Sequence, residues 1–319
     1  EHSLIRGGKE SLHEAISLHK DHGLRVNVNR LGEEVLGHDE AQRHLDMYLK
    51  LIELEGLQTI SIKVSSICAQ LSILDMKRSV ERVSEALRTL YRAAMEQNAR
   101  GNPKLLMLDM EAYRDLELTH RAFKQVLGED EFKSLRAGIV LQAYLPDTHE
   151  AFDTLLEFAE ERLEQGGAPL QIRLVKGANL AAEMVESSQR GWVNPVFPSK
   201  HLVDASFRTL LLKATSARSQ RCFRVGIASH NLFDVALGLL LSRCVGDGEG
   251  IHFEVLSGMA GPLCRCLKSL GQDVLVYCPS VSNDGLHVAV AYLVRRMDEN
   301  TGDDNFLRHS FGMKADDYA

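Results

Sequence analysis

The sequence lacks an apolar run long enough to span a membrane, and it lacks a basic stretch. A membrane-spanning helix needs about 18 or more apolar residues in a row, whereas the longest apolar stretch here runs only from Val235 to Leu241. Against 44 aspartates and glutamates there are 37 lysines and arginines, which gives a formal net charge of −7. Since those cations are scattered, the composition argues against a nucleic-acid partner.

The sequence also has too little cysteine, in the wrong spacing, for a disulfide framework. Its six cysteines are Cys68, Cys222, Cys244, Cys264, Cys266 and Cys278, and they lie in or beside apolar segments. Cys264 and Cys266 have no second ligand pair at a useful spacing, so we expect buried helix cysteines and no metal site. This pattern favours a reducing, cytoplasmic setting. The chain begins with Glu1 and has no signal-peptide pattern, so we expect one domain, residues 1–319, excised from a longer chain.

What the sequence does contain is a regular alternation of short apolar runs and longer amphipathic segments. Eight runs are nearly continuous in apolar residues, as in parallel strands covered on both faces. They are Arg25–Asn29, Thr59–Val64, Lys104–Met110, Gly138–Ala143, Leu170–Val175, Phe223–Ala228, Ile251–Val255 and Asp273–Tyr277. Helical periodicity occupies Asp39–Leu54, Lys77–Gln97, Leu116–Leu127, Thr148–Gln165, Val203–Ala217 and Leu232–Arg243.

This alternation predicts an α/β fold, a closed (β/α)8 barrel. A doubly wound open sheet is the alternative, but no Gly-x-Gly-x-x-Gly follows the first strand. In a barrel of this kind the chemistry lies at the carboxyl ends of the strands. The polar residues found there are Lys63, Asp109, Gln142, Arg173, Lys176, Ser229, His230, Asn231, Glu254 and Tyr277. Buried polar groups cost free energy unless they are paired or used, so their convergence on one rim indicates a site.

Several of these residues allow two interpretations. Arg173 and Lys176, with Gly177 permitting a close backbone approach, suit an electron-rich cofactor and its phosphates, but a salt-bridge network at the rim fits equally well. Lys63 could form a Schiff base, as in aldolase barrels, although pairing with Asp109 is favoured.

The junction Ser229-His230-Asn231 could bind an anion or simply cap the helix that starts at Leu232. His230 could act as a base, and it has no companion ligand at helical spacing, so metal binding is not expected.

The last helical segment contains two adjacent arginines beside an aromatic residue. Arg295 and Arg296 follow Tyr292 by three and four residues, so the three share one side of a helix, and Glu299 lies one turn further on. Adjacent guanidinium groups suit a carboxylate ligand. A solvated ion-pair face is the alternative.

Together these segments resemble the proline dehydrogenase family, especially the proline dehydrogenase domain of bifunctional proline utilization A (PutA) flavoenzymes. The resemblance extends from Asn29 to Arg308. It rests on Ser61-Ile-Lys-Val-Ser65, Leu108-Asp109, Gln142-Ala-Tyr144, Arg173-Leu-Val-Lys-Gly-Ala178, Pro195-Val-Phe-Pro-Ser-Lys200, Ala228-Ser-His-Asn231, Phe253-Glu-Val-Leu-Ser-Gly-Met259, Tyr277-Cys-Pro279 and Tyr292-Leu-Val-Arg-Arg-Met-Asp-Glu-Asn300.

The resemblance implies a (β/α)8 barrel that binds FAD noncovalently, with the last helix covering the carboxyl-end mouth. It implies catalytic roles for Arg173, Lys63 and Asp109. It implies a proline site of Lys63, Asp109, Ala178, Leu256, Tyr277, Tyr292, Arg295 and Arg296. Around the flavin it places Asp109, Gln142, Arg173, Lys176, Gly177, Ala178, Lys200, Ser229, His230, Asn231, Glu254 and Glu299. Glu33 matches an acidic gate residue that pairs with Arg295.

The reaction implied by the resemblance is oxidation of L-proline to Δ1-pyrroline-5-carboxylate by hydride transfer to FAD, the first step of proline catabolism. A quinone would accept the electrons. The protein would be cytoplasmic, with peripheral contact to the inner membrane as an option, and an aldehyde dehydrogenase domain could belong to the parent chain. The family usually has Tyr-Trp where this chain has Asn179-Leu180, and often Thr-Arg-Lys where it has Pro198-Ser199-Lys200. These differences concern FAD contacts more than the substrate site.

Three other functions stay open at this point. The chain could oxidise hydroxyproline or another cyclic amino acid, although the bulk of Tyr277 favours proline. It could be a Schiff-base aldolase built on Lys63, or a non-catalytic module that holds flavin or proline.

Overall fold

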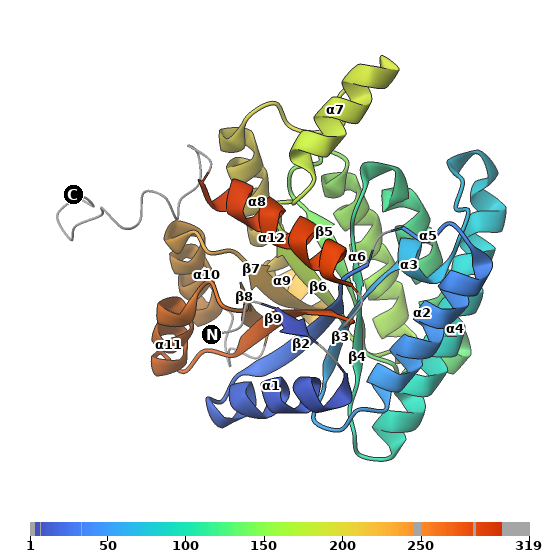
Figure 1. The fold of residues 1–319 in the computed structure, drawn as a ribbon. Helices are drawn as coiled ribbons and strands as arrows, with labels where there is room; N and C mark the ends of the chain where they lie inside the picture. The colour runs from blue at the N-terminus through green and yellow to red at the C-terminus, as the bar shows by residue number, and fades with distance from the viewer. Residues whose placement is uncertain (1–3, 7, 33, 245–249, 283–284, 302–319) are drawn as a thin grey trace.

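The chain folds into a closed barrel of eight parallel strands surrounded by helices (Figure 1). The computed structural model describes residues 4–6, 8–32, 34–244, 250–282 and 285–301. The barrel strands, in order, are β2 (Arg25–Arg30), β3 (Thr59–Lys63), β4 (Leu105–Asp109), β5 (Ala137–Gln142), β6 (Leu170–Val175), β7 (Phe223–Ala228), β8 (Ile251–Leu256) and β9 (Val274–Val281). Each pairs with its sequence neighbour, and β9 pairs with β2 to close the barrel.

All eight predicted strands are therefore confirmed, and the predicted (β/α)8 fold with them. The last strand is longer than predicted, because β9 continues past Tyr277 to Val281. A proline inside a run usually marks the edge or end of a strand, yet Pro279 pairs with Asn29 of β2. A ninth strand, β1 (Ile5–Arg6), was not predicted, because two residues carry no periodic pattern; it pairs with the end of β9.

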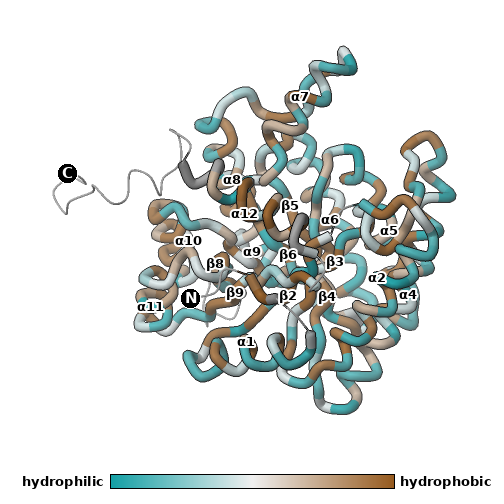
Figure 2. Tube along the Cα trace, viewed as in Figure 1, coloured by the Kyte–Doolittle hydropathy of each residue, from teal (hydrophilic) through white to brown (hydrophobic). Residues whose placement is uncertain are grey.

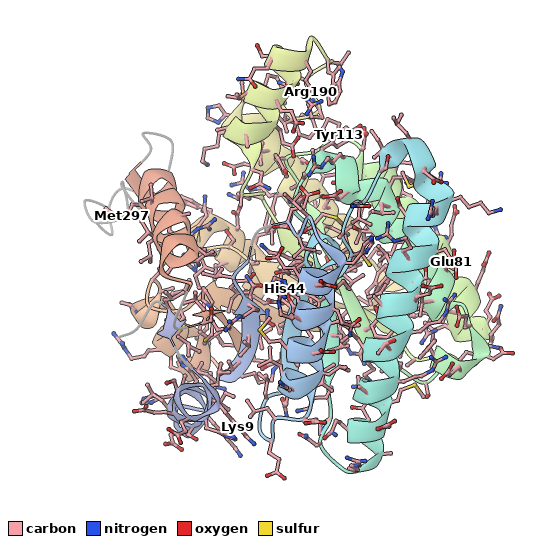
Figure 3. All side chains as sticks on the ribbon, turned by 45° about the vertical axis from the view of Figure 1, so that its right-hand side comes forward. Lys9, His44, Glu81, Tyr113, Arg190 and Met297 are labelled. Carbon is pink, nitrogen blue, oxygen red and sulfur yellow. The ribbon has the colours of Figure 1, made fainter. Side chains whose placement is uncertain are left out.

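The helices between the strands form the outer layer. They are α1 (Lys9–Asp21), α2 (His38–Ile52), α3 (Val64–Ile67), α4 (Met76–Ala99), α5 (Leu116–Leu127), α6 (Thr148–Glu164), α7 (Leu180–Arg190), α8 (Lys200–Ala214), α9 (Ala217–Cys222), α10 (Leu232–Cys244), α11 (Gly261–Ser269) and α12 (Leu286–Thr301). The six predicted helical segments correspond to α2, α4, α5, α6, α8 and α10. On the outer wall α2 and α4 lie side by side, marked by His44 and Glu81 in Figure 3, and α7, marked by Arg190, projects from the rim.

The apolar core lies between the strands and the helices. On β3 and β4, Ile60, Ile62, Leu106 and Leu108 are fully buried and alternate with residues that face the barrel axis. Helix α4 covers the outward residues with its own buried leucines and valines. Figure 2 shows apolar residues concentrated in the strands and on the inner helix faces. The core of this barrel therefore lies outside the ring of strands.

The last helix, α12, crosses the barrel rather than packing beside it (Figure 1), and it contacts β9. This confirms the prediction that the last helix covers the mouth. None of the helices described combines the length and the apolar character that a membrane span requires. Cys264 and Cys266 lie on helix α11 as predicted, but Cys264 is half-buried and Cys266 exposed, because this short helix packs mainly through Leu267.

Candidate active site

A buried arginine on the barrel axis organises the predicted site. Arg173, on β6, is 3% exposed. Its Nε donates to Glu254 Oε2 at 2.5 Å, and its Nη1 donates to Asp109 Oδ1 at 2.7 Å and to the Ser61 hydroxyl at 3.1 Å. Burial alone would lower the pKa of Arg173, but the carboxylates of Glu254 and Asp109 raise it above its usual value. The Arg173 guanidinium therefore keeps its positive charge although it is buried inside the barrel.

Glu254 is held in turn by a histidine that the sequence analysis did not single out. His252 precedes it by two residues on β8 and places Nε2 2.9 Å from Glu254 Oε1. Burial would raise the pKa of Glu254, but the charge of Arg173 and the hydrogen bond from His252 lower it to about 2. The Gln171 amide nitrogen lies 3.2 Å from the same His252 nitrogen. Because the carboxylate is ionised, His252 Nε2 must carry a proton to bind it.

Gly226, on the neighbouring strand β7, leaves the space that this pair occupies. A Cβ atom at Gly226 would lie 2.2 Å from Glu254 Oε1 and 2.8 Å from His252 Nε2. Any side chain there would displace the carboxylate or the imidazole. The absence of a side chain at position 226 is therefore part of the arrangement that fixes Arg173.

Asp109 joins Arg173 to a tyrosine. Its Oδ2 accepts a hydrogen bond from the Tyr277 hydroxyl at 2.7 Å, and the Arg173 guanidinium lies 5.3 Å from the centre of the Tyr277 ring. Burial raises the pKa of Asp109 above its usual value, although Arg173 and the Tyr277 hydrogen bond oppose the shift. The structure thus brings Arg173, Asp109, Glu254 and Tyr277 together. These contacts form a salt-bridge network at the barrel rim, which was one of the two interpretations that the sequence allowed.

Lys63 does form an ion pair, but with a different partner from the one expected. Its ammonium lies 2.6 Å from Glu111 Oε1, not on Asp109. Glu111 also accepts a hydrogen bond from the Ser65 hydroxyl at 2.5 Å. Asp109 is already engaged by Arg173 and Tyr277, and Lys63 pairs instead with Glu111, just beyond the end of β4. Glu111 lies two residues past the end of β4, so its position beside a strand end could have identified it from the sequence.

A second cluster of charges lies around Lys176. Lys176 contacts Asp204 at 2.5 Å and Asp234 at 2.7 Å, and Lys200 contacts Asp204 at 2.6 Å. The Ser229 hydroxyl donates to Asp234 Oδ2 at 3.0 Å. The predicted residues Lys176, Lys200 and Ser229 are therefore brought together through two aspartates. Asp204 was detectable from its spacing of four residues after Lys200.

His230 and Asn231 have separate roles at the start of α10. His230 Nε2 accepts a hydrogen bond from the Leu256 N–H at 3.1 Å. Burial, with a smaller contribution from the charge of Arg296, lowers the pKa of His230 to about 4, so its imidazole is neutral at pH 7. The Asn231 side chain accepts the Phe233 N–H at 2.9 Å, which confirms helix capping for this residue.

The absence of a side chain at Gly177 leaves space for the ring of Tyr144. Gly177 has a φ of +124°, and an added Cβ would lie 2.0 Å from the ring of Tyr144. The close approach expected of Gly177 is thus to Tyr144, while its neighbour Ala178 is exposed. Gln142, at the end of β5, is buried, and its amide nitrogen donates to the Met110 and Glu111 carbonyls at 3.4 and 3.3 Å.

Helix α12 brings Tyr292 and Arg296 to the mouth. Tyr292 is buried, and the Arg296 guanidinium lies 5.5 Å from the centre of its ring. This confirms that the two share one side of the helix. Helix α12 packs against β9, and the charge of Arg296 is among the causes that lower the pKa of His230, which follows β7. Glu33 and the side chains of Arg295 and Glu299 lie outside the described residues.

Comparison with known proteins agrees with this arrangement. The model of the family described as Proline dehydrogenase matches residues 12–309. The bifunctional protein PutA of Klebsiella aerogenes is 26% identical over 307 residues, which are 90% of this chain and 22% of that protein. A hydroxyproline dehydrogenase of Bos taurus is 29% identical over 165 residues, 50% of this chain and 34% of that one.

Solved structures give the same result. Proline Utilization A (PutA) from Corynebacterium freiburgense matches with a TM-score of 0.88 and 40% identity, covering 97% of this chain and 32% of that one. PutA from Bdellovibrio bacteriovorus, inactivated by N-propargylglycine, matches with a TM-score of 0.87 and 29% identity over 99% of this chain and 34% of that one. The chain thus spans about a fifth to a third of these relatives' length. It belongs to the proline dehydrogenase family.

Proposed function

We propose that this chain oxidises L-proline to Δ1-pyrroline-5-carboxylate, with FAD as the hydride acceptor. The observation that carries the proposal is the state of Arg173. This guanidinium is buried at the carboxyl ends of the strands and fixed by Asp109 and Glu254, yet its Nη2 has no hydrogen-bond partner in the part of the chain that is described. A buried donor without a partner costs free energy, which an acceptor on a bound molecule would relieve. Family membership and the names of the relatives support the choice of reaction.

The residues present fit a flavin cofactor. Arg173 would hold the flavin ring through its unpartnered Nη2. Lys176 and Lys200, which both pair with Asp204 in this structure, would exchange that contact for the phosphates of the cofactor. Of the positions that differ from the usual family pattern, Ser199 caps helix α8 by accepting the Leu202 N–H at 3.5 Å, and Leu180 begins α7. When bound, FAD supplies the ring that accepts a hydride.

On the substrate side, Arg296 and Arg295 would bind the carboxylate of proline, and Tyr292, Tyr277 and Leu256 would line its ring. Tyr277 is anchored through its hydroxyl to Asp109, so this wall is fixed before substrate arrives. A positioned substrate supplies much of the rate enhancement in reactions of this kind. The amine must be neutral, because its lone pair drives the departure of hydride from the adjacent carbon.

The Schiff-base alternative has less support. The Lys63 ammonium pairs with Glu111 at 2.6 Å, so it would have to leave this ion pair before it could attack a substrate carbonyl. Lys63 and Glu111 would instead set the charge at the edge of the proline site. The gate role of Glu33 stays a prediction.

The longer relatives suggest further parts of the proposal. The PutA relative of Klebsiella aerogenes is a bifunctional protein, so an aldehyde dehydrogenase domain elsewhere in the parent chain fits the proposal. A quinone acceptor, a cytoplasmic location and peripheral contact with the inner membrane complete it.

An anaerobic absorbance spectrum of the purified chain, recorded before and after addition of L-proline, tests the proposal. We expect a flavin band that bleaches with L-proline, and an Arg296→Gln variant that keeps the band but needs a much higher proline concentration. A chain that does not take up FAD would contradict the cofactor. Trapping of substrate on Lys63 by borohydride would instead support the aldolase. Because one relative is a hydroxyproline dehydrogenase, bleaching faster with hydroxyproline than with proline would change the substrate.

A further inference from the structure

The amino end of the barrel, opposite the candidate active site, carries three arginines. Side chains alternate along a strand, so residues two apart face the same way. Gly226 faces the axis, because its Cβ would meet Glu254 and His252 there, and Arg224 on the same strand therefore does so too. Arg136 comes directly before β5, two residues ahead of Gly138, and it lines the pocket at this end of the barrel. Arg25 precedes the inward Asn27, which donates to Ser61.

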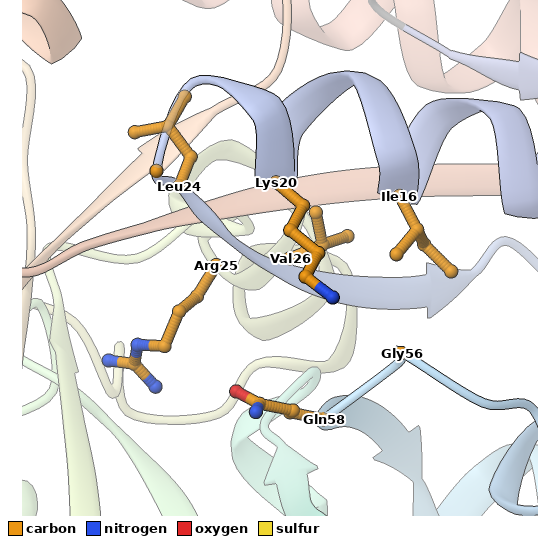
Figure 4. A pocket seen from close by; sticks show the side chains of 8 residues that line it. Ile16, Lys20, Leu24, Arg25, Val26, Gly56 and Gln58 are labelled. Atoms are coloured by element: carbon orange, nitrogen blue, oxygen red, sulfur yellow. The ribbon is translucent and has the colours of Figure 1, made fainter.

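These arginines surround a pocket at that end. The pocket has a volume of about 210 Å³, and residues at the starts of β2 to β7 line it, including Arg25, Arg136, Arg224 and Gln171. A neighbouring pocket of about 270 Å³ lies under α1 (Figure 4) and shares two lining residues with it. These are Arg25 and Gln58, whose side chains point toward the same space. The barrel is thus open at its amino end to a molecule of modest size.

The charges around the pocket are unbalanced. Arg25 pairs with Asp273, with Nη2 2.5 Å from Oδ2. Arg136 and Arg224 form no ion pair or hydrogen bond with any residue that the structure describes. Among the residues that the structure describes, no carboxylate lines either pocket. This contrasts with arginines on the outer helices, such as Arg92 with Glu131 and Arg218 with Glu160. Arg136 is exposed and Arg224 half-buried, so water can solvate both, but two unpaired cations at one pocket of a chain of net charge −7 make a local positive potential that favours an anion.

Lys104 also lines the pocket, but its ammonium is already used. It is 3% exposed and donates to the Leu57 carbonyl, to the Leu54 carbonyl at 2.6 Å and to Asn102 at 3.0 Å. The donors left for a ligand are the guanidinium groups of Arg136 and Arg224, with the amides of Gln58 and Gln171 beside them. Paired N–H groups of a guanidinium match two oxygens of a tetrahedral anion.

We infer that the amino-end mouth of the barrel binds a small, doubly charged oxyanion of the phosphate or sulfate type, between Arg136 and Arg224. The volume accommodates a phosphate group, either free or at the end of a larger molecule. This site is separate from the proline site and does not depend on the proposed reaction.

Isothermal titration calorimetry with sodium phosphate, at pH 7.5 and constant ionic strength, tests the inference on the 319-residue chain. We expect saturable binding of one phosphate, competition by sulfate and none by chloride. The double variant Arg136→Gln/Arg224→Gln should weaken binding at least tenfold. Arg136→Lys/Arg224→Lys, which keeps the charge but loses the paired donors, should give an intermediate affinity.

The matched control is Arg92→Gln/Arg218→Gln, which removes the same charge from the outer helices and should leave phosphate affinity unchanged. No saturable heat with the unaltered chain, or an equal loss in both glutamine double variants, would overturn the inference. Thermal unfolding with and without phosphate confirms that each variant is folded. Titration with glycerol phosphate distinguishes the free ion from a phosphate ester. If glycerol phosphate binds more tightly than phosphate, the site is for an ester; if it binds more weakly, the site is for the free ion.

Discussion

Replacing Gly226 with alanine tests whether the Glu254–His252 pair positions Arg173. The new Cβ would lie 2.2 Å from Glu254 Oε1. Strand β7 is hydrogen-bonded to β6 and β8 on its two sides, so its backbone has little freedom to move. We therefore expect the Glu254 carboxylate to move, and its 2.5 Å hydrogen bond with Arg173 to lengthen or break.

The expected loss of stability follows from two contributions. Overpacking by one methyl group costs about 1–3 kcal/mol. Loss of a hydrogen bond between charged groups costs about 1.5–3 kcal/mol. The sum, about 2.5–6 kcal/mol, is a large part of the free energy of unfolding of a typical domain, about 5–15 kcal/mol. With a urea dependence of about 3 kcal/mol per molar, the midpoint of unfolding should fall by about 0.8–2 M.

Gly138→Ala is the matched control. Its Cβ would also lie 2.2 Å from a neighbouring atom, but that atom is the sulfur of Met107, near the flexible end of a side chain, and the nearest backbone atom, the Gln171 carbonyl oxygen, is 3.0 Å away. We expect about 1–2 kcal/mol of destabilisation, with flavin reduction by proline unchanged. Gly226→Ala should slow flavin reduction in addition to losing stability. If the two variants were equal in stability and in flavin reduction, the positioning of Arg173 by Glu254 would be refuted.

Three further predictions concern single groups. Tyr277→Phe leaves Asp109 Oδ2 without its 2.7 Å donor, so we expect about 1–3 kcal/mol less stability in urea; an unchanged midpoint would show that another donor replaces the hydroxyl. Burial raises the pKa of Asp115 to about 6. Its charged form therefore destabilises the fold above pH 6, and this penalty fades as the pH falls toward 3.8. Asp115→Asn should thus stabilise the protein by about 1–2 kcal/mol at pH 7.5 and by nothing at pH 3.5, and an equal effect at both pH values in chemical unfolding would contradict this. Gly177→Ala combines a φ of +124° with a Cβ 2.0 Å from the Tyr144 ring, so we expect a loss of about 3 kcal/mol or more; a thermal unfolding midpoint equal to that of the unaltered chain would show that the loop relaxes.

The sequence was sufficient for the barrel, because each strand is an apolar run and the helices between them are amphipathic. Exceptions were elements with no periodicity to detect, such as the two-residue strand β1. The carboxyl-end residues were found for the same reason, since a charged residue at the end of an apolar strand, such as Arg173, is conspicuous.

What the sequence could not supply was the pairing of those residues. Lys63 lies opposite Asp109 in the strand register, yet its ion pair is with Glu111, because Asp109 is held from other strands by Arg173 and Tyr277. Such competition depends on distances across the barrel. His252 was missed although it precedes Glu254 by two residues, because it lies near the start of the predicted strand Ile251–Val255, whereas the candidates were taken from the carboxyl ends of strands.

The closure of the barrel by β9 has a consequence for the order of folding. Strand β9 pairs with β8, β2 and β1, and the Arg25–Asp273 ion pair joins positions 248 residues apart. While the chain is synthesised from its amino end, one edge of β2 stays unpaired until residues 274–281 leave the ribosome. Contacts of such sequence separation form slowly, and an open strand edge can pair with another chain. Chaperone demand should therefore be greatest on nascent chains whose residues 274–281 are still inside the ribosome or not yet synthesised, and should fall once β9 is available.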